Sequence, residues 1–302
     1  RCGAEALSTM SPALIYQQLY TAYQHEVKKM WIVNVGDIKP AEYQIELLMD
    51  MAWNMDQVEK IGIYQHMSQF LQREFGHRLA KKIVPIMQEH YRLAHIRKPE
   101  FMGNTRTEEK DPAYKIVKDL PWSEQQIQKR LLQYKHIQDA VTAIEASVPL
   151  ERKDAYFELV LYPVVAAAKM NEKHLYAQLA RHGKAEWQKS HVAYDKIVSL
   201  TAQYNALNKG KWKGIMDYKP RNLAVFDKIV EENAVVPMVN DDQPAKRIPG
   251  KDLKGSIGYE GLGYQGQAAA IPVGVEASYR LKGLKGDSVT IIVHLLPTHP
   301  VS

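Results

Sequence analysis

The sequence predicts a multidomain protein in which an α/β unit is followed by an α-helical bundle and then by a β-rich, sandwich-like segment. Three observations carry this prediction. A short apolar run rich in β-branched residues, WIVNV at 31–35, stands between two helical patterns. Amphipathic segments with helix-capping residues fill 56–207. After residue 235 the composition shifts to Gly, Pro and Val, with the alternation of β-strands.

The α/β unit is predicted from its capping residues and its apolar run. Ser11 followed by Pro12 is a favourable helix start. WIVNV is apolar on both faces, which is typical of a strand buried in a parallel sheet. Pro40 opens a second helix that runs to about Trp53. Helix, buried strand, polar turn and helix together form the unit of an α/β fold.

The bundle is predicted from helix ends that follow one another without strands between them. Gly76 is a C-cap, and Ser123 with Gln126 has the pattern of a capping box. Pro163 should kink its helix or start a second one. A further helix near 185–207 should stop at the Asn-Lys-Gly sequence that follows. About five consecutive helices predict a helical bundle.

Composition limits the class of protein. The chain has 302 residues, 45% of them hydrophobic, enough for two or three domains. No uninterrupted apolar stretch is long enough to span a membrane. Cys2 is the only cysteine, which excludes disulfide scaffolds and multi-cysteine zinc sites. The net charge of +6 is compatible with a mixed solvated surface or with an acidic partner such as nucleic acid, anionic lipid or a uronic-acid polysaccharide.

Familiar catalytic and cofactor motifs are absent from the sequence. GLGYQG at 261–266 matches the dinucleotide pattern GxGxxG, but Pro272 and Gly274 prevent the helix that this motif requires, so we interpret it as a β-turn. The sequence contains neither HExxH nor GxSxG. We therefore expect neither a metal nor a cofactor.

The polar turn after WIVNV carries the candidate chemistry. Asp37, Lys39 and Glu42 lie on the loop and first helical turn after the predicted strand, where ligands bind in parallel α/β folds. Two carboxylates near a lysine suit acid–base catalysis on an anionic, hydroxyl-rich substrate. The alternative is structural: Glu42 complements the helix dipole, worth about 0.3–1 kcal/mol, and Glu46 and Asp50 continue a solvated face.

A catalytic role for Glu42 sets a physical condition. The positive end of the helix dipole lowers the pKa of a glutamate at this position. A general acid needs a raised pKa instead, so apolar burial or a neighbouring carboxylate must outweigh the helix.

WIVNVGDIKPAEYQIELLMDMAWN resembles the signature W-[IL]-VNVGD-[IL]-KP-x-E…AWN of glycoside hydrolase family 115, the xylan α-glucuronidases. IRKPEF at 96–101, the segment LERKDAYFELVLYPVVAAAKMNEKHLYA at 150–177, and YNALNKGKWKGIMD at 204–217 extend this similarity. GLGYQGQAAAIPVG and LLPTHPV resemble the β-rich region of the family. The combined motifs cover most of the chain.

The resemblance implies an inverting hydrolase that removes 4-O-methyl-glucuronic acid side chains from xylan. It implies that 1–60 are the C-terminal part of a (β/α)8 barrel, 61–235 a helical bundle, and 236–302 a β-rich segment, in a fragment that lacks the earlier part of the barrel. The expected partner is glucuronoxylan or a xylo-oligosaccharide, with no nucleic acid, no membrane and no cofactor. A homodimer and a periplasmic or extracellular location are implied in the same way.

The resemblance also assigns site residues. Glu42 matches the glutamate of the motif and becomes the proton donor, with Asp37 as the next candidate for a catalytic carboxyl group. Lys39 would bind the carboxylate of the uronic acid. The general base would lie upstream of Arg1. Asn34, Trp53 and Asn54 are further substrate-binding positions, and the alternative for these three is a role in packing. Arg97 and Lys98 are also substrate-binding candidates, and the alternative for them is the role of a cation at a helix end.

Two competing functions remain open from sequence alone. One is a non-catalytic helical scaffold or basic binding module, although no helix face interleaves Lys and Arg with aromatic residues. The other is an inactive fragment of the hydrolase.

Overall fold

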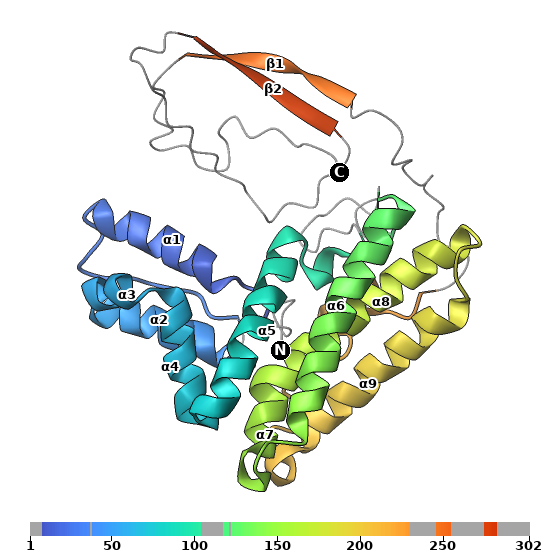
Figure 1. Cartoon of the computed structure of the whole chain (residues 1–302), viewed down its shortest axis with the longest axis horizontal. Coiled ribbons are helices and arrows are strands. Elements are labelled where there is room, and N and C mark those ends of the chain that lie inside the picture. The colour runs from blue at the N-terminus through green and yellow to red at the C-terminus, as the bar shows by residue number, and fades with distance from the viewer. Residues whose placement is uncertain are drawn as a thin grey trace.

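The computed structural model of the protein describes residues 8–36, 38–103, 117–120, 122–229, 246–254 and 275–282 (Figure 1). Its helices and strands follow in this order: α1 (Pro12–Gln24), α2 (Glu42–Trp53), α3 (Met55–Ile61), α4 (Ile63–Phe75), α5 (His77–Ile96), α6 (Glu124–Glu145), α7 (Lys153–Tyr156), α8 (Tyr162–Arg181), α9 (Trp187–Gly210), β1 (Lys246–Lys254) and β2 (Val275–Lys282). Short 3-10 turns occupy Pro99–Phe101, Leu150–Arg152, Pro220–Asn222 and Ala224–Phe226, and a π-helical turn, η4, occupies Phe157–Leu161.

The long helices pack side by side around α8. Helix α8 contacts both α6 and α9, and α5 connects α6 to α4 (Figure 1). The run of small and β-branched residues at 164–168, VVAAA, is completely or almost completely buried, which lets neighbouring helices approach α8 closely. The main hydrophobic core is made by residues of α4, α5, α6, η4, α8 and α9.

Helix boundaries agree with the capping residues in the sequence. Ser123 accepts a hydrogen bond from the backbone N–H of Gln126, whose side chain accepts one from the Ser123 N–H, so the capping box is confirmed. Gly76, with φ +79°, separates α4 from α5. Pro163 lies in the first turn of α8, directly after the π-helical turn, so it starts a second helix as one of the two predicted outcomes. The backbone leaves the helical conformation at Leu207.

The predicted strand at 31–35 is wrong. These residues form a segment without strand pairing. Trp31 is partly buried, and the side chains of 32–35 are exposed, Ile32 by 87%. A β-branched apolar run favours a strand only where neighbouring strands supply hydrogen-bond partners. The described part of 8–229 supplies none. The (β/α)8 barrel assigned to 1–60 is therefore also wrong, because the described residues there form α1, α2 and α3.

The sandwich-like segment is likewise wrong for the described residues of 236–302. Strands β1 and β2 form a two-stranded parallel sheet, in which Lys246 pairs with Val275 and Lys254 with Lys282. A sandwich requires two packed sheets. Alternating sequence predicts individual strands but not how many of them assemble. GLGYQG and LLPTHPV lie outside the described residues.

No helix in the described part of the chain is both long enough and apolar enough to cross a membrane.

Candidate functional site

Lys39 lies at the centre of the candidate site. Its Nζ donates a hydrogen bond to Oε1 of Glu42, at 2.5 Å, and another to Oε1 of Glu158. The same ammonium lies 4.3 Å from the centre of the Trp212 ring, a cation–π contact. Three segments far apart in the sequence thus meet at one lysine, and we call Lys39, Glu42, Glu158 and Trp212 the lysine cluster.

The cluster is shielded but not closed. The side chains of Lys39 and Glu158 are 11% and 9% exposed, whereas that of Glu42 is 28% exposed. Glu42 borders an open depression of about 440 Å³, which is also lined by Ile38, Lys39, Ile45 and Glu46. A ligand in this depression reaches Glu42 before it reaches the other carboxyl group.

Local sequence explains how Glu42 is placed. Pro40 is buried and precedes the first turn of α2, in which Glu42 is the first residue. On the opposite face of α2, Leu47 and Met51 are buried in a second core with residues of α3 and α1. This packing fixes the rotation of α2 and turns Glu42 toward the bundle.

Glu158 enters the site from the π-helical turn η4. Pro163 has no N–H, and its ring crowds the carbonyl of Leu159 four residues earlier, so a regular α-helix is disfavoured through this region. The wider π-helical turn at Phe157–Leu161 accommodates this break. Glu158 is the one acid in the apolar stretch FELVLYPVVAAA.

The environment of Glu42 meets the condition set by its sequence position. Burial is the main effect that raises the pKa of Glu42, to about 7, and a hydrogen bond with Glu158 adds to it. Lys39 and a backbone N–H at the start of α2 act in the opposite direction without reversing the shift. No donor among the described residues reaches Oε2 of Glu42. Two carboxyl groups can hydrogen-bond to each other only through a shared proton, so the raised pKa and the absence of another donor agree.

Lys39 stays charged in this setting. Burial alone would lower the pKa of Lys39, but hydrogen bonds to Glu158 and Glu42 outweigh it and raise the pKa above its ordinary value. An ammonium held by two carboxyl groups and an aromatic ring has little capacity left for the carboxylate of a uronic acid. The structure therefore favours a role for Lys39 in holding Glu42.

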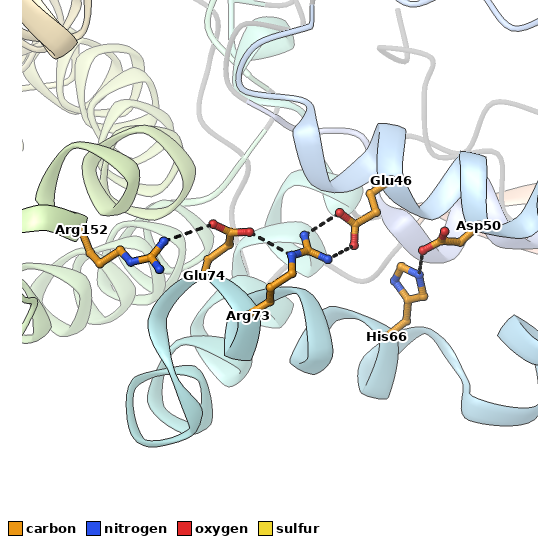
Figure 2. Close-up of polar contacts among 6 residues, drawn as sticks. All are labelled: Glu46, Asp50, His66, Arg73, Glu74 and Arg152. Atoms are coloured by element: carbon orange, nitrogen blue, oxygen red, sulfur yellow. Dashed lines mark hydrogen bonds and ion pairs between the residues drawn. The ribbon is translucent and has the colours of Figure 1, made fainter.

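The other acids of α2 serve packing against α4 (Figure 2). Glu46 accepts two hydrogen bonds from Arg73, at 2.9 and 2.6 Å, and Asp50 lies 3.0 Å from Nε2 of His66. Arg73 also contacts Glu74, which in turn lies 3.9 Å from Arg152 (Figure 2). The acidic face expected from the sequence to be solvated thus makes polar contacts with side chains of α4.

Asn34, Trp53 and Asn54, the remaining described candidates of the motif, make no hydrogen bond or ion pair with the described residues of the lysine cluster. Asn34 is exposed, and the Trp53 side chain is 91% exposed. Asn54 caps α3 by accepting a hydrogen bond from the backbone N–H of Gln57, at 3.0 Å. Within the described part of the chain, no hydrogen bond or ion pair joins these three residues to Glu42. Asp37 lies outside the described residues.

Arg97 and Lys98 lie at the end of α5. The Arg97 guanidinium donates to the carbonyl oxygen of Phe101, at 3.0 and 2.7 Å, and thereby closes the turn after the helix. Burial, and then the charge of Arg130, lower the pKa of Arg97 to about 10. Lys98 is partly buried and precedes the 3-10 turn Pro99–Phe101. These contacts match the role of a cation at a helix end.

Sequence reasoning missed Glu158 and Trp212. The signal for Glu158 was available, since an acid inside a long apolar helical stretch needs a partner when it is buried. Trp212 lies in GKWKG, directly after the break in α9, where the ring is half-buried and also lies 4.8 Å from Nζ of Lys211. Both residues belong to stretches that carry the resemblance. No group of three or more potential metal ligands occurs in the part of the chain described by the structure.

Comparison with known proteins connects this arrangement to a family. The profile of glycosyl hydrolase family 115 matches residues 3–101. A solved structure of a family 115 4-O-methyl-α-glucuronidase, BtGH115A, with specificity for decorated arabinogalactans, is 58% identical in sequence, with a TM-score of 0.76. The alignment covers 78% of this chain and 31% of that one, so the chain spans about a third of that protein's length. No curated protein matches the chain. From the family profile and the 58% identity, we conclude that the chain belongs to glycosyl hydrolase family 115.

Proposed function

We propose that this chain is part of a glycoside hydrolase that removes glucuronic acid or 4-O-methyl-glucuronic acid side chains from a polysaccharide, with Glu42 as the proton donor. The observation that carries the proposal is a carboxyl group that borders an open depression and has a pKa of about 7. Such a group holds its proton at the pH where a general acid must deliver it. BtGH115A, to which the chain is similar, is a 4-O-methyl-α-glucuronidase.

The proposed step is an inverting hydrolysis. Glu42 gives its proton to the glycosidic oxygen as the bond from that oxygen to the anomeric carbon breaks. Water adds to the anomeric carbon from the opposite face and loses a proton to a second carboxylate. Inversion requires about 6.5–9.5 Å between the two carboxyl groups, so that this water fits between them.

Lys39 and Trp212 support this step by holding Glu42. The ammonium fixes one oxygen of the carboxyl group, and the indole ring holds the ammonium from the bundle side. The remaining predicted substrate-binding residues, whose roles are part of the proposal, are Asn34, Trp53, Asn54, Arg97 and Lys98. Asp37 stays the second predicted catalytic residue.

Glucuronoxylan is the first substrate to test, with a decorated arabinogalactan beside it, because the similar protein BtGH115A has specificity for decorated arabinogalactans. Polysaccharides do not diffuse across bilayers, so the proposal places the protein in the periplasm or outside the cell. A homodimer is proposed from the family resemblance.

Substitution of Glu42 by Gln in the full-length enzyme tests the proposal. Gln keeps the size of the side chain but has no acidic proton, so release of glucuronic acid should fall by about 10³-fold while Tm barely changes. An aryl glucuronide needs little protonation of its leaving group, so its hydrolysis should fall much less. Wild-type activity should decline above about pH 7, as Glu42 loses its proton.

Glu89→Gln is the matched control, because Glu89 forms a pair with Arg92 three residues away, as Glu42 does with Lys39, on an exposed part of α5. It should retain full activity. If Glu42→Gln keeps more than a tenth of the activity on the polysaccharide, Glu42 is a dipole-complementing residue and not the acid. Equal losses on both substrates would indicate that Glu42 positions the sugar or the water.

A further inference from the structure

The helical bundle contributes a carboxyl group to the lysine cluster that the family motif around Glu42 does not contain. Glu158 is 116 positions after Glu42 in the sequence, yet both accept hydrogen bonds from the same ammonium. We propose that Glu158 is a positioning residue, which holds Lys39 against Glu42 and shares one proton with the Glu42 carboxyl group. This inference rests on the proposed function.

Charge counting supports one shared proton. Two ionised carboxylates and one ammonium would leave a net charge of −1 in a largely buried place, which is unfavourable. One proton on the pair of carboxyl groups makes the lysine cluster neutral. The proton also supplies the hydrogen bond that otherwise has no donor at Oε2 of Glu42.

Among the described residues, no other group facing Glu42 replaces Glu158 in this role. On α2 the nearest charged neighbour one turn away is Glu46, which is held by Arg73. From α5, the buried Tyr91 hydroxyl senses the charge of Glu42, but burial raises the pKa of Tyr91 to about 12, so it remains neutral. From the turn before α2 comes Lys39 itself, and from η4 comes Glu158.

The geometry excludes Glu158 as the second carboxylate of the hydrolysis. The Oε1 atoms of Glu42 and Glu158 both accept a hydrogen bond from Nζ of Lys39, so their separation cannot exceed twice the 2.5 Å of the Lys39–Glu42 hydrogen bond. Inversion needs about 6.5–9.5 Å for a water between the carboxyl groups. Two oxygens held by one ammonium leave no space for a sugar ring between them. Glu158 therefore acts through Glu42 and not on the substrate.

A buried acid is also poorly explained by stability alone. Apolar residues of similar volume often replace a buried ion pair without loss of stability. Glu158 is flanked by the buried Phe157 and by Val160, where an apolar residue would complete the core. Its retention next to Lys39 and Glu42 is better explained by control of the Glu42 proton.

The test is the pH profile of kcat/KM for glucuronic acid release by wild type and by Glu158→Gln. Gln still accepts a hydrogen bond from Lys39, but it has no negative charge and cannot share a proton in the same way. Glu42 should then lose its proton more easily. The basic limb of the profile, where activity falls with rising pH, should therefore shift to lower pH by at least about one unit. At each pH where the wild-type activity is already falling, a shift of about one pH unit leaves Glu158→Gln with about tenfold less activity than wild type. Activity at pH 5 and Tm should change little.

Two variants and a second measurement complete the test. Glu172→Gln, on α8 and paired with Lys169, should leave the profile unchanged. Glu158→Asp keeps the charge but is shorter, so its limb should lie between wild type and Glu158→Gln. Titration of the Glu42 side-chain carboxyl by ¹³C NMR, in wild type and in Glu158→Gln, should show the same downward shift without any substrate.

The outcomes separate the inference from the proposed function. An unmoved basic limb and an unmoved NMR titration in Glu158→Gln would overturn the role of Glu158. Equal loss of activity at every pH together with a lowered Tm would assign Glu158 a purely structural role. If the full-length enzyme releases no glucuronic acid, the proposed function fails, and the NMR titration still decides whether the two carboxyl groups share a proton.

Discussion

Lys173 gives the sharpest prediction about stability. This α8 residue is fully buried, and its Nζ donates to the carbonyl oxygens of Val225 and Asp227, at 2.8 and 2.9 Å. The carbonyl groups have no net charge, so they offset only part of the lost hydration. Burial is the main effect that lowers the pKa of Lys173, to about 7, and the charge of Asp227 opposes it.

The lowered pKa makes stability depend on pH. In the unfolded chain, a lysine with a pKa of about 10.4 stays protonated up to pH 9, whereas folded Lys173 has lost most of its proton by pH 8. The unfolded state therefore binds more protons, so the free energy of unfolding rises with pH. Integration from pH 7 to pH 9 gives a gain of about 2 kcal/mol from this one group.

Urea unfolding at pH 7, 8 and 9 measures this gain. In Lys173→Met, which replaces the amine by an apolar side chain of similar length, the gain should vanish, so the difference between wild type and variant isolates Lys173. Lys169→Met is the control on the same helix, because Lys169 pairs with Glu172 and remains partly exposed. If wild type and Lys173→Met depend on pH in the same way, Lys173 is solvated in the native protein and the argument from burial is refuted.

Two arginines should differ strongly in their contribution to stability. Arg130 is buried and donates hydrogen bonds to Asn171 and to the carbonyl oxygens of Leu93 and Arg97. Arg130→Met should therefore lower the free energy of unfolding, measured by urea titration, by about 3 kcal/mol. A loss below about 1 kcal/mol would contradict this packing. The side chain of Arg73 is about half exposed in its pairs with Glu46 and Glu74. Arg73→Ala should therefore lower the free energy of unfolding by less than about 1 kcal/mol. A loss of more than about 2 kcal/mol would show instead that these pairs are essential to the fold.

The helices were predictable because their signals are local. Ser123 and Gln126 lie within one turn, and Gly76 ends α4 wherever the rest of the chain goes. Pro163 has no backbone N–H to donate to a preceding turn, so it favours the first turn of a helix. Such restrictions depend on neighbouring residues and hold in any tertiary structure.

The strand and the complete site were not predictable for the opposite reason. A strand needs partners, and WIVNV carries no information on whether partners are present. The pKa of Glu42 depends on Glu158, which only the packing of α2 against the bundle brings close. Sequence identified the need for burial or a second carboxyl group, but only tertiary structure supplies that group.

The central claim is that the folded protein keeps Glu42 protonated near neutral pH, ready to act as an acid. The direct measurement is the ¹³C NMR titration of side-chain carboxyl groups in wild type, with Glu42→Gln used to assign the signal that disappears. This signal should titrate at about pH 7, well above the ordinary value for glutamate of about 4.5. Titration of the Glu42 signal below about pH 5 would contradict the account, because an ordinary glutamate at a helix start would then explain the residue completely.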